Sequence, residues 1–373
     1  MKIGTITFHS SYNFGSNLQS YALQQYVKKI FNNRNSNAEY KIINLRTINQ
    51  KNIYDYKSDN SFFKRMVRLV FLGKKLKRRK INFESFINNY LSTTKEYASR
   101  DDIIKGNDSF DICISGSDQI WNLKANDFDW SYFLDGIKCK RKISYAVSSG
   151  PRKIELSIEE REKIKKLIKD YDYISVREDG TKKFVSEFTD KEIEINMDPT
   201  ILLTKTEWEE IINKEKLIDV PYIFYYSLKP SYSRIKYLKK ISKKMNMKIV
   251  VAYPAFKYEI MSGFIKKYDS GPLDFLNLIK NAKLVISSSF HGTIFSIILN
   301  VPFYALNGKN DYRISTLLKT IGLEKRMILE NDDLDKINED AFQIDFNEAN
   351  KAIDKEREKS KRYLIKALEL GDK

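Results

Sequence analysis

One histidine stands where acid–base chemistry could be placed. His291 lies in the polar run Ser287–Thr293 and is one of only two histidines in the chain. An imidazole can donate and accept a proton near neutral pH, so it suits a general acid or base. The apolar run Lys283–Ile286 before it predicts a buried strand, and Thr293–Leu299 after it predicts a helix. This spacing places His291 at a strand-to-helix turn, where the N–H groups of a helix start favour an anion. The alternative, that His291 only caps the turn, fits the spacing equally well.

A second group of polar side chains follows the first predicted strand. Strand Ile3–Phe8 runs into His9, Asn13 and Asn17, and a helix is predicted over Leu18–Phe31. The three polar side chains could face a ligand at the helix start. A loop held by its own side-chain hydrogen bonds is an equally good interpretation.

Two further strands end in charged residues. Strand Phe110–Ser115 leads to Asp118, which could be a carboxylate at the ligand-binding edge of a sheet or only an N-cap. Strand Tyr173–Val176 leads to Arg177, whose guanidinium could bind a carboxylate or a phosphate. The alternative for Arg177 is a surface ion pair with Glu or Asp.

The order of the predicted elements indicates the fold class. Strands and helices alternate through both halves of the chain, which predicts parallel sheets in an α/β fold. The pattern restarts near Leu203, so we expect one domain over residues 1–203 and a second over residues 204–345. The second domain carries the His291 motif, and residues 346–373 are predicted to form a long charged helix.

Composition and charge narrow the functional classes. The net charge of +17 favours an anionic partner, but no zinc-finger spacing, RNP-like motif or basic region leading into heptads is present, so we expect no nucleic acid partner. Two cysteines, Cys113 and Cys139, do not make a disulfide framework, and we expect no bound metal or cofactor. The chain opens on a strand with no signal peptide before it, which predicts a cytoplasmic protein.

The segment Phe62–Lys80 differs from the rest of the chain. It holds nine Lys or Arg residues interleaved with Phe, Leu, Val and Met. A basic, apolar segment of this kind can lie on an anionic membrane surface, which would make the protein peripheral at the inner face of the membrane. The alternative is a helix packed on its own domain with its charges in solvent.

Short motifs in a fixed order carry a resemblance to a known family. The motifs are Ile3–His9 with Asn13–Gly15 and Leu18–Leu23, then Gly116–Asn122, Ser144–Ser148, Ser175–Glu178, Asp198–Thr200, Gly271–Pro272 with Phe275, and Ser289–Thr293. By the order and spacing of these motifs, the chain resembles the polysaccharide pyruvyl transferase family from Met1 to about Leu323.

The resemblance implies a fold and an activity. It implies two Rossmann-like domains in a GT-B-like arrangement with a cleft between them, the N-terminal domain on the acceptor side and the C-terminal domain on the donor side. It implies transfer of pyruvate from phosphoenolpyruvate, as co-substrate, to a sugar of a lipid-linked or nucleotide-linked precursor of a cell-surface polysaccharide, forming a ketal. The residues implied are His291 and Asp118 as catalytic groups; Arg177, Ser289, Gly292, Thr293, Lys309 and Arg313 at the donor; and His9, Asn13, Asn17, Gln119 and Trp121 at the acceptor.

The chain departs from the family pattern beside the histidine. Many members carry Arg-Leu-His where this chain has Ser289-Phe290-His291, and others carry Asp where Ser288 stands. An arginine that would help to hold the donor is therefore absent, and its charge must come from Arg177, Lys309 or Arg313. The alternatives are a GT-B-type glycosyltransferase with a nucleotide-sugar donor and a non-catalytic glycan-binding relative.

Overall fold

The fold is that of a computed structural model of the 373-residue chain. The structure describes residues 1–34, 37–54, 62–150, 155–228, 231–254, 263–306, 308–328, 337 and 339–368, with the backbone alone at residues 52–54, 62–71, 232, 309 and 339. Two compact units emerge: unit 1 contains residues 1–58, 87–203 and 354–373, and unit 2 contains residues 59–86 and 204–353. One division follows Leu203, where the sequence pattern restarts, but residues 59–86 belong to unit 2 rather than to the N-terminal domain.

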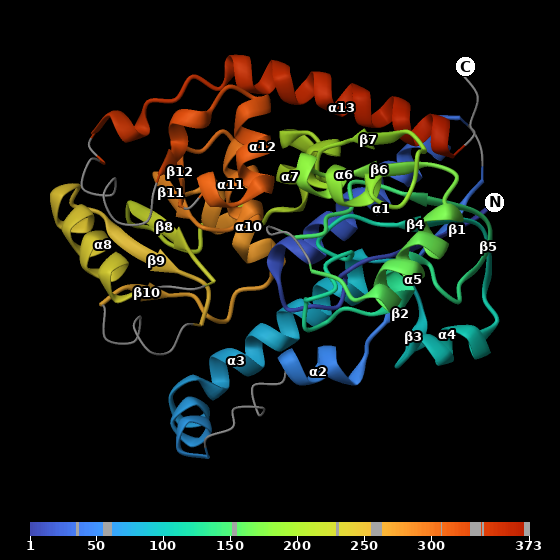
Figure 1. Cartoon of the computed structure of the whole chain (residues 1–373). Helices are drawn as coiled ribbons and strands as arrows, with labels where there is room; N and C mark the ends of the chain where they lie inside the picture. The colour runs from blue at the N-terminus through green and yellow to red at the C-terminus, as the bar shows by residue number, and fades with distance from the viewer. Residues whose placement is uncertain are drawn as a thin grey trace. The chain divides into compact units, whose positions relative to one another are not determined.

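Unit 1 is built on a five-stranded parallel sheet in the order β3-β2-β1-β4-β5 (Figure 1). The pair β6-β7 continues this sheet through single bridges from Ile143 to Tyr173 and from Val147 to Val176. Its strands and helices are β1 (Lys2–Ile6), α1 (Phe14–Asn33), β2 (Glu39–Leu45), α2 (Ile48–Tyr54), β3 (Thr93–Tyr97), α4 (Arg100–Gly106), β4 (Ser109–Ser115), β5 (Lys138–Ser144), α5 (Ile158–Lys169), β6 (Ile174–Val176), α6 (Asp179–Ser186) and β7 (Ile193–Ile195), with short 3-10 helices η1 (Trp130–Phe133) and η2 (Pro199–Leu202).

Unit 2 is built on a six-stranded parallel sheet in the order β10-β9-β8-β11-β12-β13 (Figure 1). Its elements are α7 (Lys205–Ile211), β8 (Tyr222–Tyr226), α8 (Tyr232–Lys244), β9 (Lys248–Val251), β10 (Ile265–Lys266), α10 (Pro272–Lys280), β11 (Leu284–Ser287), α11 (Phe290–Ile298), β12 (Phe303–Leu306), α12 (Tyr312–Thr320) and β13 (Met327–Ile328), with short 3-10 helices η3 (Gly308–Asn310), η4 (Glu324–Arg326) and η6 (Glu339–Phe342).

Buried apolar runs explain why the parallel sheets form. Every residue of β8 and of β11 is buried, as expected for central strands covered on both faces. In unit 2 the Phe275 ring of α10 lies edge-on to Tyr226 at 5.0 Å, and Trp208 of α7 lies edge-on to Phe295 of α11 at 4.9 Å. These contacts fix the helices that follow and precede β11. The sequence prediction of parallel-sheet α/β units is confirmed.

Two long helices are divided between the units by the contacts that they make. Helix α3 (Phe62–Tyr90) belongs to unit 2 as far as Phe86, and α13 (Asn347–Ala367) joins unit 1 from Asp354 onward. Tyr363 of α13 donates a hydrogen bond to the Ser144 carbonyl of unit 1 at 2.7 Å. The C-terminal helix is therefore an integral part of the packing and no separate appendage.

Candidate functional site

The chain reverses its direction of strand addition between β8 and β11 in unit 2. From β8 the sheet grows toward β9 and β10, and from β11 it grows toward β12 and β13. In open α/β sheets, ligands bind outside the carboxyl ends of the strands at such a reversal, which here lies between β8 and β11. The residues that follow these two strands, Ser227 and Ser288, lie together there: the Ser288 Oγ donates to the Ser227 Oγ at 2.9 Å. This edge is the candidate site of unit 2.

The first turn of α11 starts three residues before the Thr293 start that the sequence predicts. Ser289 is the N-cap, with its side chain accepting from the Gly292 N–H, and its carbonyl accepts from the Thr293 N–H and hydroxyl at 3.0 and 3.1 Å. A Cβ on Gly292 would lie 2.2 Å from the Ser287 Oγ, so only glycine lets the helix start so close to β11. Ser289, Gly292 and Thr293 thus build the turn that carries His291.

His291 is the second residue of α11 and is buried, with 6% of its surface exposed. Its ring lies edge-on to the Phe290 ring at a centroid distance of 5.3 Å. The helix start supplies N–H groups and the positive end of the helix dipole beside this imidazole. A proton-transfer group and an anion-binding element therefore share one helical turn.

Sequence reasoning missed a buried cation at this edge. Arg234, in the first turn of α8, is 4% exposed, and its Nη1 donates to the Ser227 Oγ at 3.1 Å. In the sequence this one arginine is inconspicuous, because it stands in a lysine-rich stretch with Lys236, Lys239, Lys240, Lys243 and Lys244. The available signal was its spacing: Arg234 precedes Ile235 and Leu238, which form the buried face of α8.

The donor residues expected after β12 have different surroundings. The Arg313 guanidinium makes a bidentate ion pair with Asp311, with Nε–Oδ1 and Nη2–Oδ2 distances of 3.0 and 2.6 Å, and lies 5.9 Å from the Phe290 ring. Burial opposes ionisation of Asp311, but the Arg313 charge and hydrogen bonds outweigh it and lower the pKa of that carboxyl. The Arg313 guanidinium thus lies near Phe290, the residue before His291, while two of its nitrogens are bound by the Asp311 carboxylate. The Lys309 side chain lies outside the described residues.

Unit 1 has a reversal of the same kind between β1 and β4, and Asp118 lies at its carboxyl edge. Its Oδ2 accepts from the Ser16 hydroxyl in the first turn of α1 at 2.6 Å, and its Oδ1 accepts from the Gln119 N–H at 2.8 Å. Asp118 has a φ of +82°, a conformation that is uncommon outside glycine. Strained backbone conformations cluster at functional sites, and this one lies at the edge of the sheet where ligands bind.

Arg177 lies in the interior of unit 1 in a buried ion pair. Its Nη2 is 2.7 Å from Asp198 Oδ2 and also donates to the Ser117 Oγ, and both charged side chains are almost fully buried. Asp198 Oδ1 accepts from the Thr200 N–H and hydroxyl at 2.9 and 2.7 Å. The ion pair that the sequence offered as the alternative for Arg177 is present, but it is buried and not on the surface.

The loop after β1 is held by its own side chains. His9 Nε2 lies 2.9 Å from Asn44 Oδ1, and its Nδ1 lies 3.2 Å from the Thr7 carbonyl. Asn13 caps α1, and Asn17 donates to the carbonyls of His9 and Ser11 at 2.9 and 2.8 Å. Helix α1 therefore starts at Phe14, earlier than predicted, and takes Asn17 into its first turn. These contacts match the interpretation of a self-bonded loop, and an acceptor role for the three residues stays a prediction.

The two remaining acceptor candidates differ in exposure. Gln119 is partly exposed beside Asp118. Trp121 is fully buried: its ring stacks on Phe133 at 4.8 Å, and its indole N–H donates to the Tyr132 carbonyl at 3.2 Å. The structure gives Trp121 a packing role in the core of unit 1, so we do not carry it into the proposed acceptor site.

The candidate residues thus form one group in each unit. Unit 2 brings together Ser288, Ser289, His291, Gly292 and Thr293 with Ser227 and Arg234, and Arg313 approaches through Phe290. Unit 1 brings together Asp118, Gln119 and the α1 start, with Arg177 linked through Ser117. The group in unit 2 combines an imidazole, a buried guanidinium and serine hydroxyls, which suits proton transfer to a bound anion.

The basic segment Phe62–Lys80 is helical as part of α3, and its C-terminal half packs on unit 2. Leu72, Leu76 and Arg79 are buried. Arg79 donates to the carbonyls of Ala252 and Ser270 at 3.4 and 3.2 Å and lies over the Phe83 ring at 4.7 Å. Arg79 is therefore a core residue and no surface cation, whereas Lys74, Lys77 and Lys80 are exposed. The side chains of residues 62–71 lie outside the described ones.

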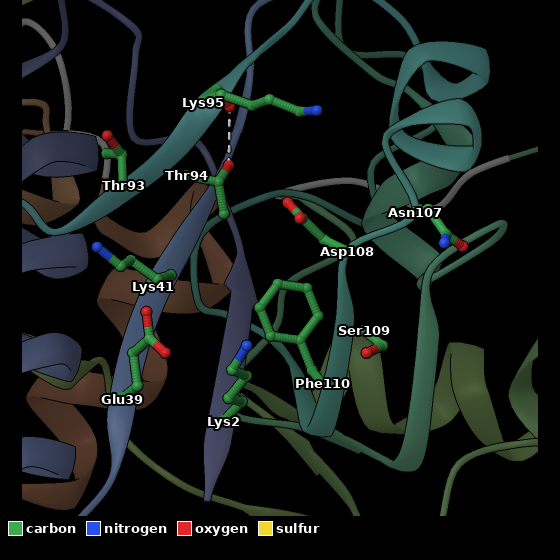
Figure 2. Close-up of a pocket in the computed structure, with 10 residues that line it drawn as sticks. All are labelled: Lys2, Glu39, Lys41, Thr93, Thr94, Lys95, Asn107, Asp108, Ser109 and Phe110. Atoms are coloured by element: carbon green, nitrogen blue, oxygen red, sulfur yellow. Dashed lines mark hydrogen bonds between the residues drawn. The ribbon is translucent and has the colours of Figure 1, made fainter.

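A pocket of about 460 Å³ lies elsewhere on unit 1 (Figure 2). It is lined by Lys2, Glu39, Lys41, Thr93, Thr94, Lys95, Asn107, Asp108, Ser109 and Phe110. These include the first residues of β1, β2, β3 and β4, so the pocket lies at the amino ends of the strands. Ligands of parallel sheets bind at the carboxyl ends. Because none of the candidate residues lines this pocket, we do not assign the reaction to it.

Neither a metal site nor a membrane-spanning helix is found among the described residues. Within the described ranges, no group of three or more His, Cys, Asp or Glu residues is placed to hold a metal ion. None of the helices that the structure describes is long and apolar enough to cross a membrane.

The whole chain is similar in fold to solved structures of sugar-nucleotide epimerases. The UDP-GlcNAc 2-epimerase of Methanocaldococcus jannaschii, solved with UDP-GlcNAc and UDP, aligns over 100% of both chains with a TM-score of 0.55 and 15% identity. That of Neisseria meningitidis, bound to UDP-GlcNAc, aligns over 100% of both chains with a TM-score of 0.54 and 9% identity. That of Rickettsia bellii covers 98% of this chain and 96% of its own, with a TM-score of 0.55 and 12% identity. At these identities the likeness concerns the fold alone, which is of the GT-B type.

Sequence comparison identifies the family. No curated protein matches the chain. A family model described as polysaccharide pyruvyl transferase matches residues 13–310, which span α1 to η3 and include both candidate groups. Since the match covers far more than half of the 373 residues, the chain belongs to the polysaccharide pyruvyl transferase family.

Proposed function

We propose that the protein transfers pyruvate from phosphoenolpyruvate to a sugar of a polysaccharide precursor and forms a cyclic ketal. The observation that carries the proposal is His291, held in the first turn of α11 at the carboxyl edge of β11 within the residues that the family model matches. Phosphoenolpyruvate carries a carboxylate and a phosphate, and a helix start with nearby Arg and Ser side chains suits such a ligand.

The proposed reaction requires one proton transfer before the C–O bonds can form. A proton adds to the methylene carbon of phosphoenolpyruvate, which becomes a methyl group, and the neighbouring carbon becomes oxocarbenium-like. One sugar hydroxyl attacks that carbon, inorganic phosphate leaves, and a second hydroxyl of the same sugar closes the ketal. Of the two hydroxyl protons, one balances the proton added to the methylene and the other leaves with phosphate.

His291 is proposed as the group that moves these protons. It gives a proton to the methylene carbon and regains one from an attacking hydroxyl, so a single imidazole can serve both steps. We propose Ser289, Gly292, Thr293, Arg313 and Lys309 for the donor side and Asp118, His9, Asn13, Asn17 and Gln119 for the acceptor side. Arg177 is not carried into the donor site, because its guanidinium is held in the buried ion pair with Asp198. Asp118 is proposed as a second proton acceptor from the sugar.

The donor can be tested without knowing the acceptor. Phosphoenolpyruvate at 100 times its Kd should stabilise the protein by about 2.7 kcal/mol, which a thermal-shift assay detects easily. UDP-GlcNAc at the same concentration should give no shift. A shift with UDP-GlcNAc alone would favour a nucleotide-sugar glycosyltransferase, and no shift with either donor would favour a non-catalytic glycan-binding relative.

A lipid-linked acceptor would bring the protein to the inner face of the membrane, and we propose that α3 helps it bind there. The exposed cations that support this are Lys74, Lys77 and Lys80, each able to contribute up to about 1 kcal/mol near an anionic surface. Salt should weaken such binding, because exposed charges are screened beyond a Debye length.

A further inference from the structure

The edge of unit 2 that carries His291 also holds a buried guanidinium. In this chain the buried guanidinium at that edge of unit 2 comes from α8, whose residue Arg234 follows β8. Since β8 and β11 are hydrogen-bonded parallel neighbours, residues that follow β8 lie at the same edge of the sheet as those that follow β11.

The hydroxyl groups of Ser227 and Ser288 link this guanidinium to the His291 turn. Arg234 Nη1 donates to the Ser227 Oγ at 3.1 Å, and the Ser288 Oγ donates to the same oxygen at 2.9 Å. The Ser288 N–H in turn donates to the Tyr226 carbonyl at 3.1 Å, which fixes Ser288 against the end of β8. Ser288 stands three residues before His291. The guanidinium, the two hydroxyls and the start of α11 therefore lie along one short edge.

We propose that Arg234, with Ser227 and Ser288, forms the anion-binding subsite for the phosphate or carboxylate of the donor. Arginine is well suited to this task because its planar fork can bond two oxygens of such a group at once. The proposal deepens the proposed function and rests on it for the identity of the donor. It assigns Arg234 to the donor and Ser288 to the edge of the same subsite.

Ser288 provides a test that leaves the arginine in place. Ser288→Asp would place a carboxylate next to the Ser227 hydroxyl, which the Arg234 guanidinium also contacts. This carboxylate would compete with an anionic ligand for the guanidinium. The Ser288→Asn side chain has the same shape without the charge. We expect Ser288→Asp to weaken binding of phosphoenolpyruvate and of inorganic phosphate by about 10- to 100-fold, the range for losing a charge-assisted hydrogen bond. Ser288→Asn should keep binding within a few-fold of the natural protein.

The arginine is tested directly with Arg234→Gln and a matched control. Lys236→Gln makes the same change in net charge on an exposed position of the same helix, and it should leave binding unchanged. Arg234→Gln should lose the thermal shift with phosphoenolpyruvate, whereas Arg234→Lys, a point charge without the fork, should keep part of it. An arginine with only a structural role would lower the melting temperature of the free protein and leave the ligand-induced shift intact.

The outcomes separate this subsite from the proposed function. If Arg234→Gln and Ser288→Asp bind phosphoenolpyruvate as the natural protein does, the subsite is wrong and the pyruvyl transfer proposal stands. If the natural protein binds UDP-GlcNAc instead and both variants lose it, the subsite is supported and the donor is wrong. If the natural protein binds none of phosphoenolpyruvate, inorganic phosphate and UDP-GlcNAc measurably, both the subsite and the pyruvyl transfer proposal fail.

Discussion

Gly292 offers a quantitative test of how the His291 turn is built. A Cβ at this position would lie 2.2 Å from the Ser287 Oγ and 2.9 Å from the Ser287 Cβ. Gly292→Ala gains about 0.5–1 kcal/mol in helix propensity, but overpacking of this kind costs about 1–3 kcal/mol. We therefore expect a net local destabilisation of about 1–2 kcal/mol in α11. Native-state hydrogen exchange of α11 amides measures this locally, which matters because two units need not unfold as one.

The Ser287 hydroxyl is the atom that the added methyl group meets first, so it completes a double-mutant cycle. Ser287→Ala removes that oxygen, together with the bond that it accepts from the Ser289 N–H at 3.0 Å. Ser287→Ala keeps the Cβ that lies 2.9 Å from the added methyl group, so it relieves only part of the overlap. The double variant should therefore be destabilised by less than the sum of the two single changes. Additive effects within about 0.5 kcal/mol would show that the two residues do not interact and would refute the packing explanation.

Three further predictions concern other parts of the chain. Arg177→Met should destabilise unit 1 by about 3–5 kcal/mol, because it leaves the Asp198 charge buried without its ion-pair partner. In urea unfolding, the double variant with Asp198→Asn should lose less stability than the two single variants lose together. A loss equal to that total would show that the two residues are not coupled. The pKa of Asp311 is lowered in the folded protein, so its stabilisation is present above the unfolded pKa of about 3.9 and is lost as pH falls through the folded pKa; Asp311→Asn should flatten this acid-side loss in a melting-temperature profile, and an unchanged profile would contradict the assignment. The natural protein should bind anionic liposomes in a salt-sensitive way and should not bind neutral ones. This binding should disappear when exposed α3 cations are reversed to Glu while Arg79 is kept. Equal flotation with neutral vesicles would instead favour a helix that only packs on its own unit. The reversed residues are Lys74, Lys77 and Lys80.

Local patterns were sufficient to predict the parallel α/β architecture, although not the strands β3, β10 and β13. The continuous apolar runs of β8 and β11 are strand signals whether or not the neighbours are known, and their alternation with helices implies parallel pairing. Helix starts were less well predicted. Asn13 caps α1 because Phe14 and the residues after it are buried against unit 1, and a loop-like run of Asn, Ser and Gly does not reveal that burial. The same holds for Ser289, whose capping role depends on Gly292 fitting against Ser287.

The charged residues show where the sequence is insufficient. In the sequence, Arg79 and Arg234 each stand among several other basic residues, as exposed charges usually do. Both are buried in the structure: Arg79 donates to the Ser270 carbonyl, far away in the chain, and Arg234 donates to the Ser227 hydroxyl after β8. Arg177 was recognised as special from its place after a strand, but its partner Asp198 lies 21 residues later. Whether a cation is a ligand-binding group, an ion-pair member or a solvated charge depends on tertiary burial, which hydrophobic periodicity does not encode.

The proton that we propose His291 delivers can be observed directly in the product. With phosphoenolpyruvate, a hexose-containing glycan acceptor and solvent D2O, the natural protein should release phosphate and form a ketal whose methyl group carries a solvent deuteron, seen by NMR. His291→Ala should fold normally and slow this transfer by about 10²–10⁴-fold, the usual cost of losing a general acid or base. Turnover by the variant above half of the natural rate, or a ketal methyl without solvent deuterium, would contradict the role assigned to His291.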